Sequence, residues 1–189
     1  MNDERLTWLR VPDEEDLPAE VQALYDAPRE KLGFVPNVLR LYALRPLHLL
    51  RWNDHYEELM KGESGLSKAE REMIAVVVSV ANKCKYCIGA HSAALRKLTK
   101  DAALADAIAV DHRTAPIELR VRAMLDYATK LTLHPTEMTE ADVDALRETG
   151  WSDEDVMDIA EVTGMFNLTN RMASGLGWEP NPEYESLGR

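Results

Sequence analysis

The segment between Ser67 and Val80 constrains the fold more than any other part of the sequence. Ser67-x-x-Glu70 matches a capping box, in which the serine and the glutamate satisfy each other's free backbone N–H groups at a helix start. The run from Met73 to Val80 follows directly and is apolar apart from Ser79. A helix that is apolar on all sides has to be covered by protein all round, so the sequence predicts a buried helix here.

The same run is rich in β-branched residues and would also suit a buried strand. A strand that leads into Cys84-Lys85-Tyr86-Cys87 at a helix start would give the thioredoxin arrangement. The capping box, however, starts a helix that continues straight into the run. No other part of the chain shows a convincing two-residue alternation from which the rest of a sheet could be built. We therefore predict an all-α fold, a multi-helix bundle.

Start and stop signals predict further helices on both sides of this segment. A first helix is expected to open at Pro18, with Asp16 as its cap. Later helices are expected over Pro46 to Gly62, Pro116 to about Leu133 and about Glu154 to Gly175, with further start signals at Thr139 and Ser152, each followed by an aspartate three residues on.

The size and charge of the chain exclude several classes of partner. Its 189 residues suffice for one hydrophobic core or two small ones. With 22 basic and 33 acidic residues the formal charge is −11, which repels phosphate backbones and anionic lipid, so neither nucleic acid nor a membrane is an expected partner. The N-terminus lacks the basic and apolar regions of a signal peptide, and we expect a cytoplasmic protein.

Both cysteines of the chain fall in one window, Cys84-x-x-Cys87. If a helix begins near Cys84, the backbone N–H groups at its start favour a thiolate, and the short spacing lets the pair close into a disulfide. At about 100° per residue, the side chains of Cys84, Cys87 and His91 fall within an arc of roughly 60°, so one helix face carries two sulfurs and an imidazole. An imidazole beside a thiol can take its proton or return one to a leaving oxygen.

Glu72 is the fourth candidate. It lies just before the wholly apolar run, where an ionised carboxylate needs a partner or a raised pKa. A solvated first-turn glutamate like Glu70 fits the composition equally well.

Three interpretations of this cluster compete. The first is redox chemistry of the cysteine pair. The second is a zinc site, with Cys84, Cys87 and His91 as three ligands and an acid or water as the fourth. The third is two buried small residues beside an ordinary surface histidine.

The motif and its flanks resemble a known family. Leu66-Ser67-x-x-Glu70-Arg71-Glu72, followed by Cys84-x-Tyr86-Cys87-x-x-x-His91, is similar to the AhpD-like alkyl hydroperoxidase core of the carboxymuconolactone decarboxylase superfamily. Two further pieces resemble its peroxidase-related branch: Gly33-x-Val35-Pro36-Asn37 with Pro46, and Phe166-Asn167-x-x-Asn170-Arg171. On this resemblance we expect an N-terminal arm over residues 1–16, a single AhpD-like helical domain over 17–178 and a C-terminal tail over 179–189.

The resemblance implies a dithiol-dependent peroxidase, usually a homo-oligomer, that reduces hydrogen peroxide or small organic hydroperoxides. In the family the second cysteine attacks the peroxide, here Cys87, and the first resolves the sulfenic acid, here Cys84. Glu72 and His91 would form the proton relay. No bound cofactor is implied; a dihydrolipoyl group or another dithiol protein reduces the disulfide. The alternatives are a thiol–disulfide oxidoreductase or redox sensor with little peroxide turnover, and a zinc-binding or interaction module.

Residues around the motif give weaker expectations. Well-studied family members carry a histidine where Tyr86 stands, and a tyrosine donates a hydrogen bond but is a poor base at neutral pH. Asn167 is a candidate for the shell around the site, with Asn170 and Arg171, although capping and salt bridges would explain these residues too. Trp52 and Tyr56 fit the core better than a substrate wall. Trp8 and Trp178 are expected in terminal arms, where large aromatics often pack against a neighbouring subunit.

Overall fold

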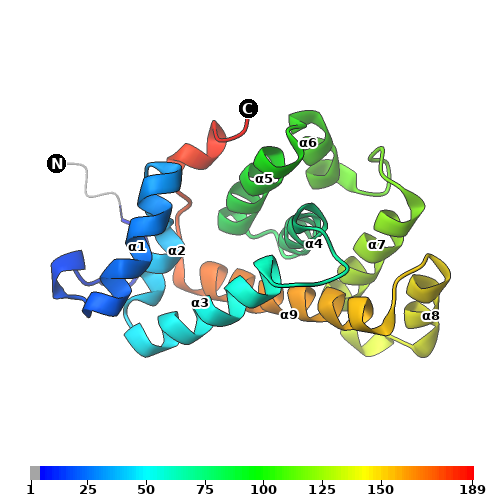
Figure 1. The fold of residues 1–189 in the computed structure, drawn as a ribbon, viewed down its shortest axis with the longest axis horizontal. Coiled ribbons are helices and arrows are strands. Elements are labelled where there is room, and N and C mark those ends of the chain that lie inside the picture. The colour runs from blue at the N-terminus through cyan, green and yellow to red at the C-terminus, as the bar shows by residue number, and fades with distance from the viewer. Residues whose placement is uncertain (1–4) are drawn as a thin grey trace.

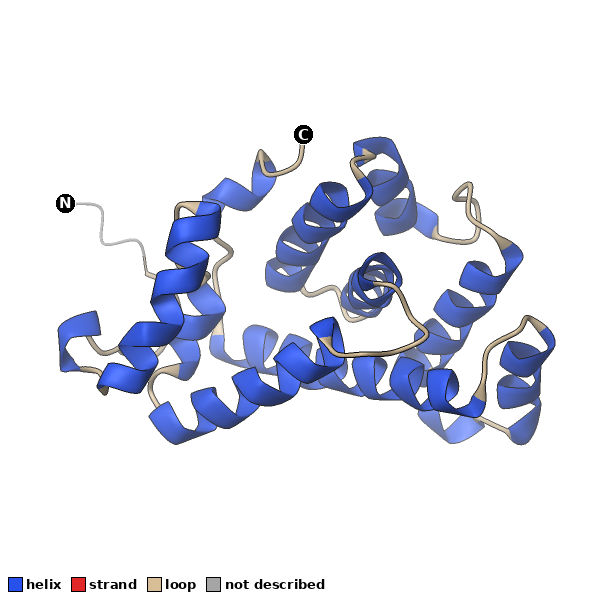
Figure 2. Ribbon diagram, in the orientation of Figure 1, coloured by secondary structure: helices blue, strands red, loops and turns tan. Residues whose placement is uncertain are grey.

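The fold is built from helices alone. The computed structural model describes residues 5–189, and within them there are nine α-helices, three short 3-10 helices and no strand (Figure 2). The α-helices are α1 (Ala19–Leu32), α2 (Asn37–Tyr42), α3 (Pro46–Lys61), α4 (Lys68–Ala81), α5 (Lys85–Thr99), α6 (Ala102–Asp111), α7 (Leu119–Leu133), α8 (Glu140–Glu148) and α9 (Asp153–Leu176). The 3-10 helices are η1 (Glu14–Asp16), η2 (Pro135–Glu137) and η3 (Pro182–Glu185). The predicted all-α class is confirmed.

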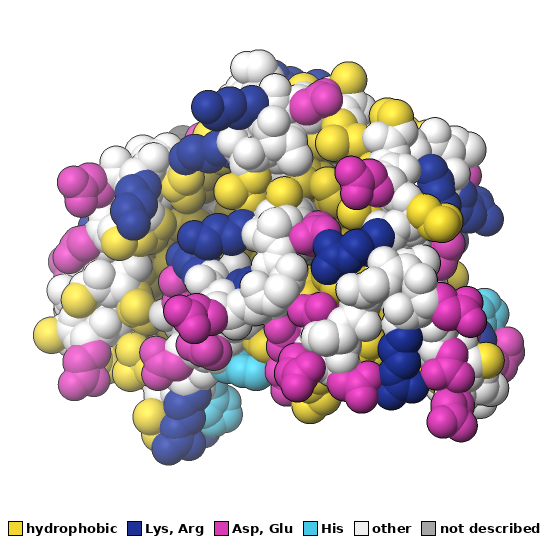
Figure 3. All heavy atoms as spheres, turned by 45° about the vertical axis from the view of Figure 1, so that its right-hand side comes forward, with side chains coloured by type: hydrophobic (Ala, Val, Ile, Leu, Met, Phe, Trp, Pro, Cys, Tyr) yellow, Lys and Arg dark blue, Asp and Glu magenta, His cyan; other side chains and the backbone are white. Residues whose placement is uncertain are grey.

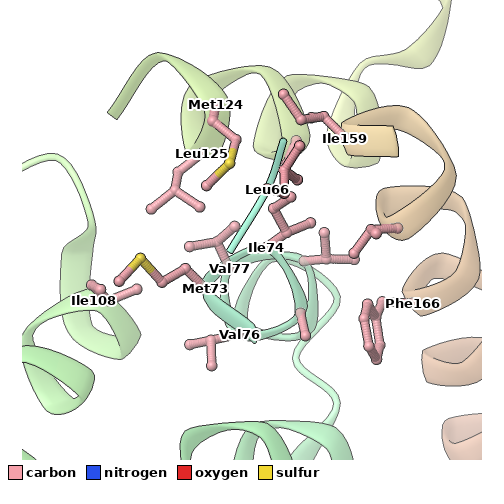
Figure 4. Packing of buried hydrophobic residues seen from close by; sticks show 14 of the residues in the cluster. Leu66, Met73, Ile74, Val76, Val77, Ile108, Met124, Leu125, Ile159 and Phe166 are labelled. Atoms are coloured by element: carbon pink, nitrogen blue, oxygen red, sulfur yellow. The ribbon is translucent and has the colours of Figure 1, made fainter. Parts of the chain in front are cut away.

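Helix α4 is the centre of the molecule. In Figure 1 it is seen nearly end-on, with α5, α6, α7 and α9 around it, and it packs against each of these four. Every residue of α4 from Arg71 to Ser79 is buried. Figure 4 shows side chains leaving α4 in several directions, including Ile74 and Val77, to meet Leu125 of α7 and Phe166 of α9. The wholly apolar run is thus a buried helix, as its pattern predicts.

The capping boxes form as the sequence indicates. Ser67 Oγ accepts a hydrogen bond from the Glu70 backbone N–H at 3.2 Å, and the Ser67 N–H donates to Glu70 Oε2 at 2.7 Å. The Ser152 N–H likewise donates to Asp155 Oδ2 at 3.0 Å, and the Thr139 N–H to Asp142 Oδ2 at 2.8 Å. These side chains accept hydrogen bonds from backbone N–H groups that have no partner within the first helical turn.

Three predicted helix ends are wrong. Asp16 lies in η1, and Pro18 itself is the cap of α1, with no side chain bonding to the free N–H groups. Helix α7 begins at Leu119 rather than at Pro116, because its cap residue Glu118 has an extended backbone. The last helix runs past Gly175 to Leu176 and ends at Gly177, whose φ of 63° is the left-handed conformation that glycine adopts at low cost.

Both ends of the described chain lie against the helices. The Trp8 N–H donates to the Leu176 carbonyl at 3.0 Å, and the Glu179 N–H to the Leu6 carbonyl at 2.9 Å. Trp178 is buried within its own chain, so the expectation that it packs against a neighbouring subunit is wrong. Trp8, by contrast, is 63% exposed.

The C-terminal segment that follows Trp178 is held at two places. The Asn37 N–H donates to Asn181 Oδ1 at 2.7 Å, at the start of α2. The buried Arg96 of α5 donates from Nη2 to the Tyr184 carbonyl at 2.6 Å. Figure 1 shows this segment, in red, between α1 and α5.

The surface carries charged side chains of both signs together with exposed apolar ones. On the face shown in Figure 3, basic side chains are scattered and acidic ones gather toward the lower part. Among the described residues, no helix combines the length and the apolar content that crossing a bilayer requires.

The central position of α4 makes its core residues sensitive to truncation. Ile74 is fully buried, so Ile74→Ala leaves a cavity that the surrounding helices fill only in part, and we expect a loss of about 2–5 kcal/mol in the free energy of unfolding. Urea denaturation followed by circular dichroism measures it. The control is Val110→Ala in α6, a side chain 83% exposed, which should change stability little. Equal effects of the two substitutions would contradict the central role of α4.

Candidate active site

A tight turn between α4 and α5 positions the cysteine pair. Asn82 ends α4, Lys83 reverses the chain at a φ of 56°, and Cys84 is the cap residue of α5. The Cys84 N–H donates to the Ser79 carbonyl at 2.9 Å, which ties the start of α5 to the last turn of α4. Cys87 then lies in the first turn of α5, directed into the protein. Both thiols are free and buried.

The two thiols hold their protons with unequal strength. They hydrogen-bond to each other, so that one sulfur takes the negative charge while the other donates its proton. This bond is the largest cause that lowers the pKa of Cys84 to about 6; the Cys87 backbone N–H, the Ser174 side chain and the charge of a protonated His91 act in the same direction. The same bond, together with burial, raises the pKa of Cys87. The pair therefore carries one negative charge near neutral pH, located on Cys84.

Glu72 and His91 form a buried pair beside the thiols. Glu72 Oε2 lies 2.7 Å from His91 Nδ1, and both side chains are about nine-tenths buried. The His91 ring packs edge-on against Phe166, with ring centroids 4.4 Å apart. Because Glu72 engages Nδ1, the other ring nitrogen of His91 is left to exchange protons with a neighbour. The alternatives of a solvated Glu72 and of an ordinary surface His91 are therefore wrong.

The structure does not favour a metal site. Across residues 5–189, no group of three or more histidine, cysteine and acidic side chains is arranged to hold a metal ion. The shared helix face brings Cys84, Cys87 and His91 together as expected. Nδ1 of His91, however, contacts Glu72, and the two free thiols interact with each other without a disulfide.

Tyr86 hydrogen-bonds to the start of α2. Its Oη accepts a hydrogen bond from the Val38 N–H at 2.8 Å, at the start of α2, and its ring packs edge-on against Trp178. Burial raises the pKa of Tyr86 well above its ordinary value, so the phenol stays protonated and cannot act as a base near neutral pH.

Asn170 and Ser79 contact the site more directly than the predicted Asn167. The side chains of both lower the pKa of Cys87 against the larger effects of Cys84 and burial, and Asn170 Nδ2 donates to Ser79 Oγ at 3.1 Å. Asn167 is connected to Asn170 through two hydrogen bonds: its Oδ1 accepts from Asn82 Nδ2 at 3.1 Å, and Asn82 Nδ2 also donates to Asn170 Oδ1 at 3.0 Å. The signal that could have identified Ser79 is its position as the one hydroxyl within the apolar run of α4.

Aromatic rings continue from the cysteine pair toward α3. The Tyr42 and Trp52 rings stack with centroids 4.7 Å apart, Trp52 and Tyr56 with centroids 5.2 Å apart, and Tyr42 also meets Trp178 edge-on. Trp52 and Tyr56 are half-buried and pack against the two hydrophobic cores. This fits the expectation that they belong to the core.

The site thus defines a class: helical proteins with a buried dithiol beside a carboxylate–imidazole pair. A family model, the carboxymuconolactone decarboxylase family, matches residues 46–112, from the start of α3 to the end of α6. The matched part contains all four candidate residues, Glu72, Cys84, Cys87 and His91.

Solved structures extend the likeness to the whole chain. An uncharacterized peroxidase-related protein from Silicibacter sp. TM1040 shares 47% identity with a TM-score of 0.95, over 100% of this chain and 99% of that one. An uncharacterized peroxidase-related protein from Ralstonia eutropha JMP134, described as an alkylhydroperoxidase AhpD core, shares 42% identity with a TM-score of 0.95, over 98% of both chains. The chain therefore belongs to the superfamily that joins AhpD-like proteins and carboxymuconolactone decarboxylases.

A more distant likeness shows that activity varies on this fold. The debrominase Bmp8 has a TM-score of 0.81 at 17% identity, over 98% of this chain and 96% of that one, and at this identity only the fold is shared. No curated protein matches the chain.

The unequal thiols predict a pH dependence that can be measured on the reduced protein. Because the pKa of Cys84 is lowered to about 6, its thiolate is present above that pH and is lost as the pH falls through it. We expect iodoacetamide to alkylate Cys84 first, with a midpoint near this value, as measured by mass spectrometry of the labelled peptide. Cys84→Ser should abolish the low-pH reaction. Preferential labelling of Cys87, or a midpoint in the ordinary thiol range, would contradict the assignment.

Proposed function

We propose that the chain is a dithiol-dependent peroxidase that reduces hydrogen peroxide or small organic hydroperoxides. The observation that carries the proposal is a pair of free, buried thiols on the same helix as His91, whose ring contacts the buried Glu72 at 2.7 Å. A peroxidase needs these two things: a thiolate to attack an oxygen, and a group that supplies a proton to the oxygen that leaves. The family and the relatives described as peroxidase-related support the same activity.

In the first step, the proton that Cys87 shares passes to Cys84, and the charge moves to Cys87. The Cys87 thiolate attacks one peroxide oxygen, and the O–O bond breaks. Sulfur is oxidised to a sulfenic acid, and the leaving oxygen takes a proton from His91 to become an alcohol, or water from hydrogen peroxide. Glu72 stabilises the charged imidazole and holds the ring in place.

In the second step, Cys84 resolves the sulfenic acid. Cys84 gives its proton to the Glu72–His91 pair, and its sulfur forms a bond to the sulfur of Cys87. Hydroxide leaves and is protonated to water, so two thiols and one peroxide yield one disulfide, one alcohol and one water. An external dithiol, such as a dihydrolipoyl group, then returns two electrons by thiol–disulfide exchange.

The assignment of Cys87 as the attacking residue has a physical basis, although Cys84 is the more acidic thiol. The hydrogen bond between the thiols lets the charge move from Cys84 to Cys87 by a single proton transfer. On Cys87 the charge is stabilised by the side chains of Asn170 and Ser79. A thiolate of higher intrinsic pKa is also the stronger nucleophile once it is formed.

A second candidate function is thiol–disulfide exchange with little peroxide turnover. The lowered pKa of Cys84 favours it, because a thiolate near neutral pH suits attack on a disulfide. The burial of both sulfurs favours the peroxidase instead, since a small peroxide fits an enclosed site better than a protein disulfide does.

Substitution of the attacking cysteine tests the proposal. We expect Cys87→Ser to abolish peroxide consumption with dihydrolipoamide as the reductant. In the wild-type protein, one equivalent of peroxide should rapidly form a Cys84–Cys87 disulfide, detected by mass spectrometry. Full activity in Cys87→Ser would refute the mechanism, and disulfide formation only under excess oxidant would favour thiol–disulfide exchange.

Substitution of the imidazole tests the proton relay. His91→Asn removes the group that protonates the leaving oxygen, and we expect kcat/KM for peroxide to fall by at least about 10²-fold. The control is His55→Asn, an exposed position on α3, which should leave the rate unchanged. Similar rates in the two variants would remove His91 from the mechanism.

A further inference from the structure

A chain of side-chain amides runs from the protein surface to the cysteine pair. Arg171 Nη1 donates to Asn167 Oδ1 at 2.7 Å, and Asn82 Nδ2 donates to the same oxygen at 3.1 Å. Asn82 Nδ2 also donates to Asn170 Oδ1 at 3.0 Å, and Asn170 Nδ2 donates to Ser79 Oγ at 3.1 Å. Arg171 is exposed, whereas Ser79 and Asn170 are buried.

The chemistry at the outer end fixes the orientation of Asn167. A guanidinium has donors and no acceptor, so the Asn167 atom that faces Arg171 must be oxygen. The backbone carbonyl of Thr163 accepts a hydrogen bond from the other side of the same amide at 3.0 Å, and a carbonyl has no donor. Each contact independently places Asn167 Oδ1 toward Asn82.

The orientation of Asn167 fixes that of Asn82, which in turn fixes that of Asn170. The atom of Asn82 that faces Asn167 Oδ1 must be its NH₂ group, whose second hydrogen reaches Asn170. The atom of Asn170 that faces Asn82 must then be oxygen. The NH₂ group of Asn170 is thereby directed toward Ser79, in the buried region that also holds Cys87, and it cannot turn over without breaking the chain.

We propose that Asn170 is a catalytic residue that donates a hydrogen bond to the sulfur of Cys87, and that Asn82 and Asn167 are positioning residues that keep its NH₂ group in that direction. The inference rests on the proposed function and adds how Cys87, the more deeply buried thiol, receives the charge it needs for attack. With one hydrogen on Ser79 Oγ, the second hydrogen of the Asn170 NH₂ group is available for the sulfur. Ser79 accepts from Asn170 and so has its own proton free for the same atom.

Two donors on one sulfur favour its charged form and oppose the effects of burial and of the negative charge on Cys84. They leave the Cys84 side of the pair untouched, since the other donors to Cys84 are the Cys87 N–H and Ser174. The amide chain therefore acts selectively on the attacking thiol and lowers the cost of moving the charge from Cys84 to Cys87.

The test is carried out in a Cys84→Ser background, in which Cys87 is the one thiol of the chain. Asn170→Leu keeps the approximate volume and removes the donor, and Asn82→Ala removes the group that orients it. The readout is the pH dependence of iodoacetamide alkylation of Cys87. A hydrogen bond to a charged group has a strength that corresponds to roughly one to two pKa units, so Asn170→Leu should slow alkylation near neutral pH by about tenfold or more. Asn82→Ala should shift the profile in the same direction by less.

Asn53→Ala is the matched control for Asn82→Ala: Asn53 is also a half-buried asparagine, on α3, and should leave the profile in place. Circular dichroism shows whether each variant is folded, and if Asn170→Leu does not fold, the half-buried Asn82→Ala decides alone. An unchanged profile in the folded variants overturns the inference. Because alkylation needs no peroxide turnover, failure of the peroxidase proposal and failure of this inference are seen in separate experiments.

Discussion

The burial of α4 from Arg71 to Ser79 is the constraint on which the rest of the structure depends. A helix without a polar face needs neighbours on every side, and α5, α6, α7 and α9 supply them. The polar groups that α4 does carry must then find partners inside the protein, because water does not reach them. Glu72 at its beginning bonds to His91, and Ser79 near its end bonds to Asn170. The requirement to cover one apolar helix thus brings the site residues of α5 and α9 together.

The site places ionisable groups in a buried region, and their pairing keeps the net charge of that region small. The thiols carry one negative charge between them, and Glu72 meets an imidazole that can balance it. Each sulfur has its own set of donors: the start of α5 and Ser174 for Cys84, and Asn170 and Ser79 for Cys87. Two chemically identical side chains three residues apart therefore acquire different roles from their surroundings.

The sequence predicts the fold class well, because the capping box at Ser67 and the apolar run after it are local signals. The Glu72–His91 contact joins two different helices, and it is expected from the resemblance to the AhpD-like family; composition alone fits a solvated Glu72 equally well. Exact helix ends are less predictable: Pro116 suits a first helical turn, yet Glu118 has an extended backbone and the helix begins only after it. Asn170 could not be separated from Asn167 in advance, since both lie on one long helix and their difference depends on how α9 is rotated against α4. That rotation is set by packing between distant segments, which no local pattern records.

The position of the C-terminal segment has a consequence for the order in which the molecule is completed. Trp178 covers Tyr86, and Asn181 and the Tyr184 carbonyl secure the last residues to α2 and α5. During synthesis the ribosome makes Cys84 and Cys87 roughly a hundred residues before these covering groups emerge. The dithiol therefore becomes enclosed only after the chain has been extended well beyond the helices that carry Cys84 and Cys87.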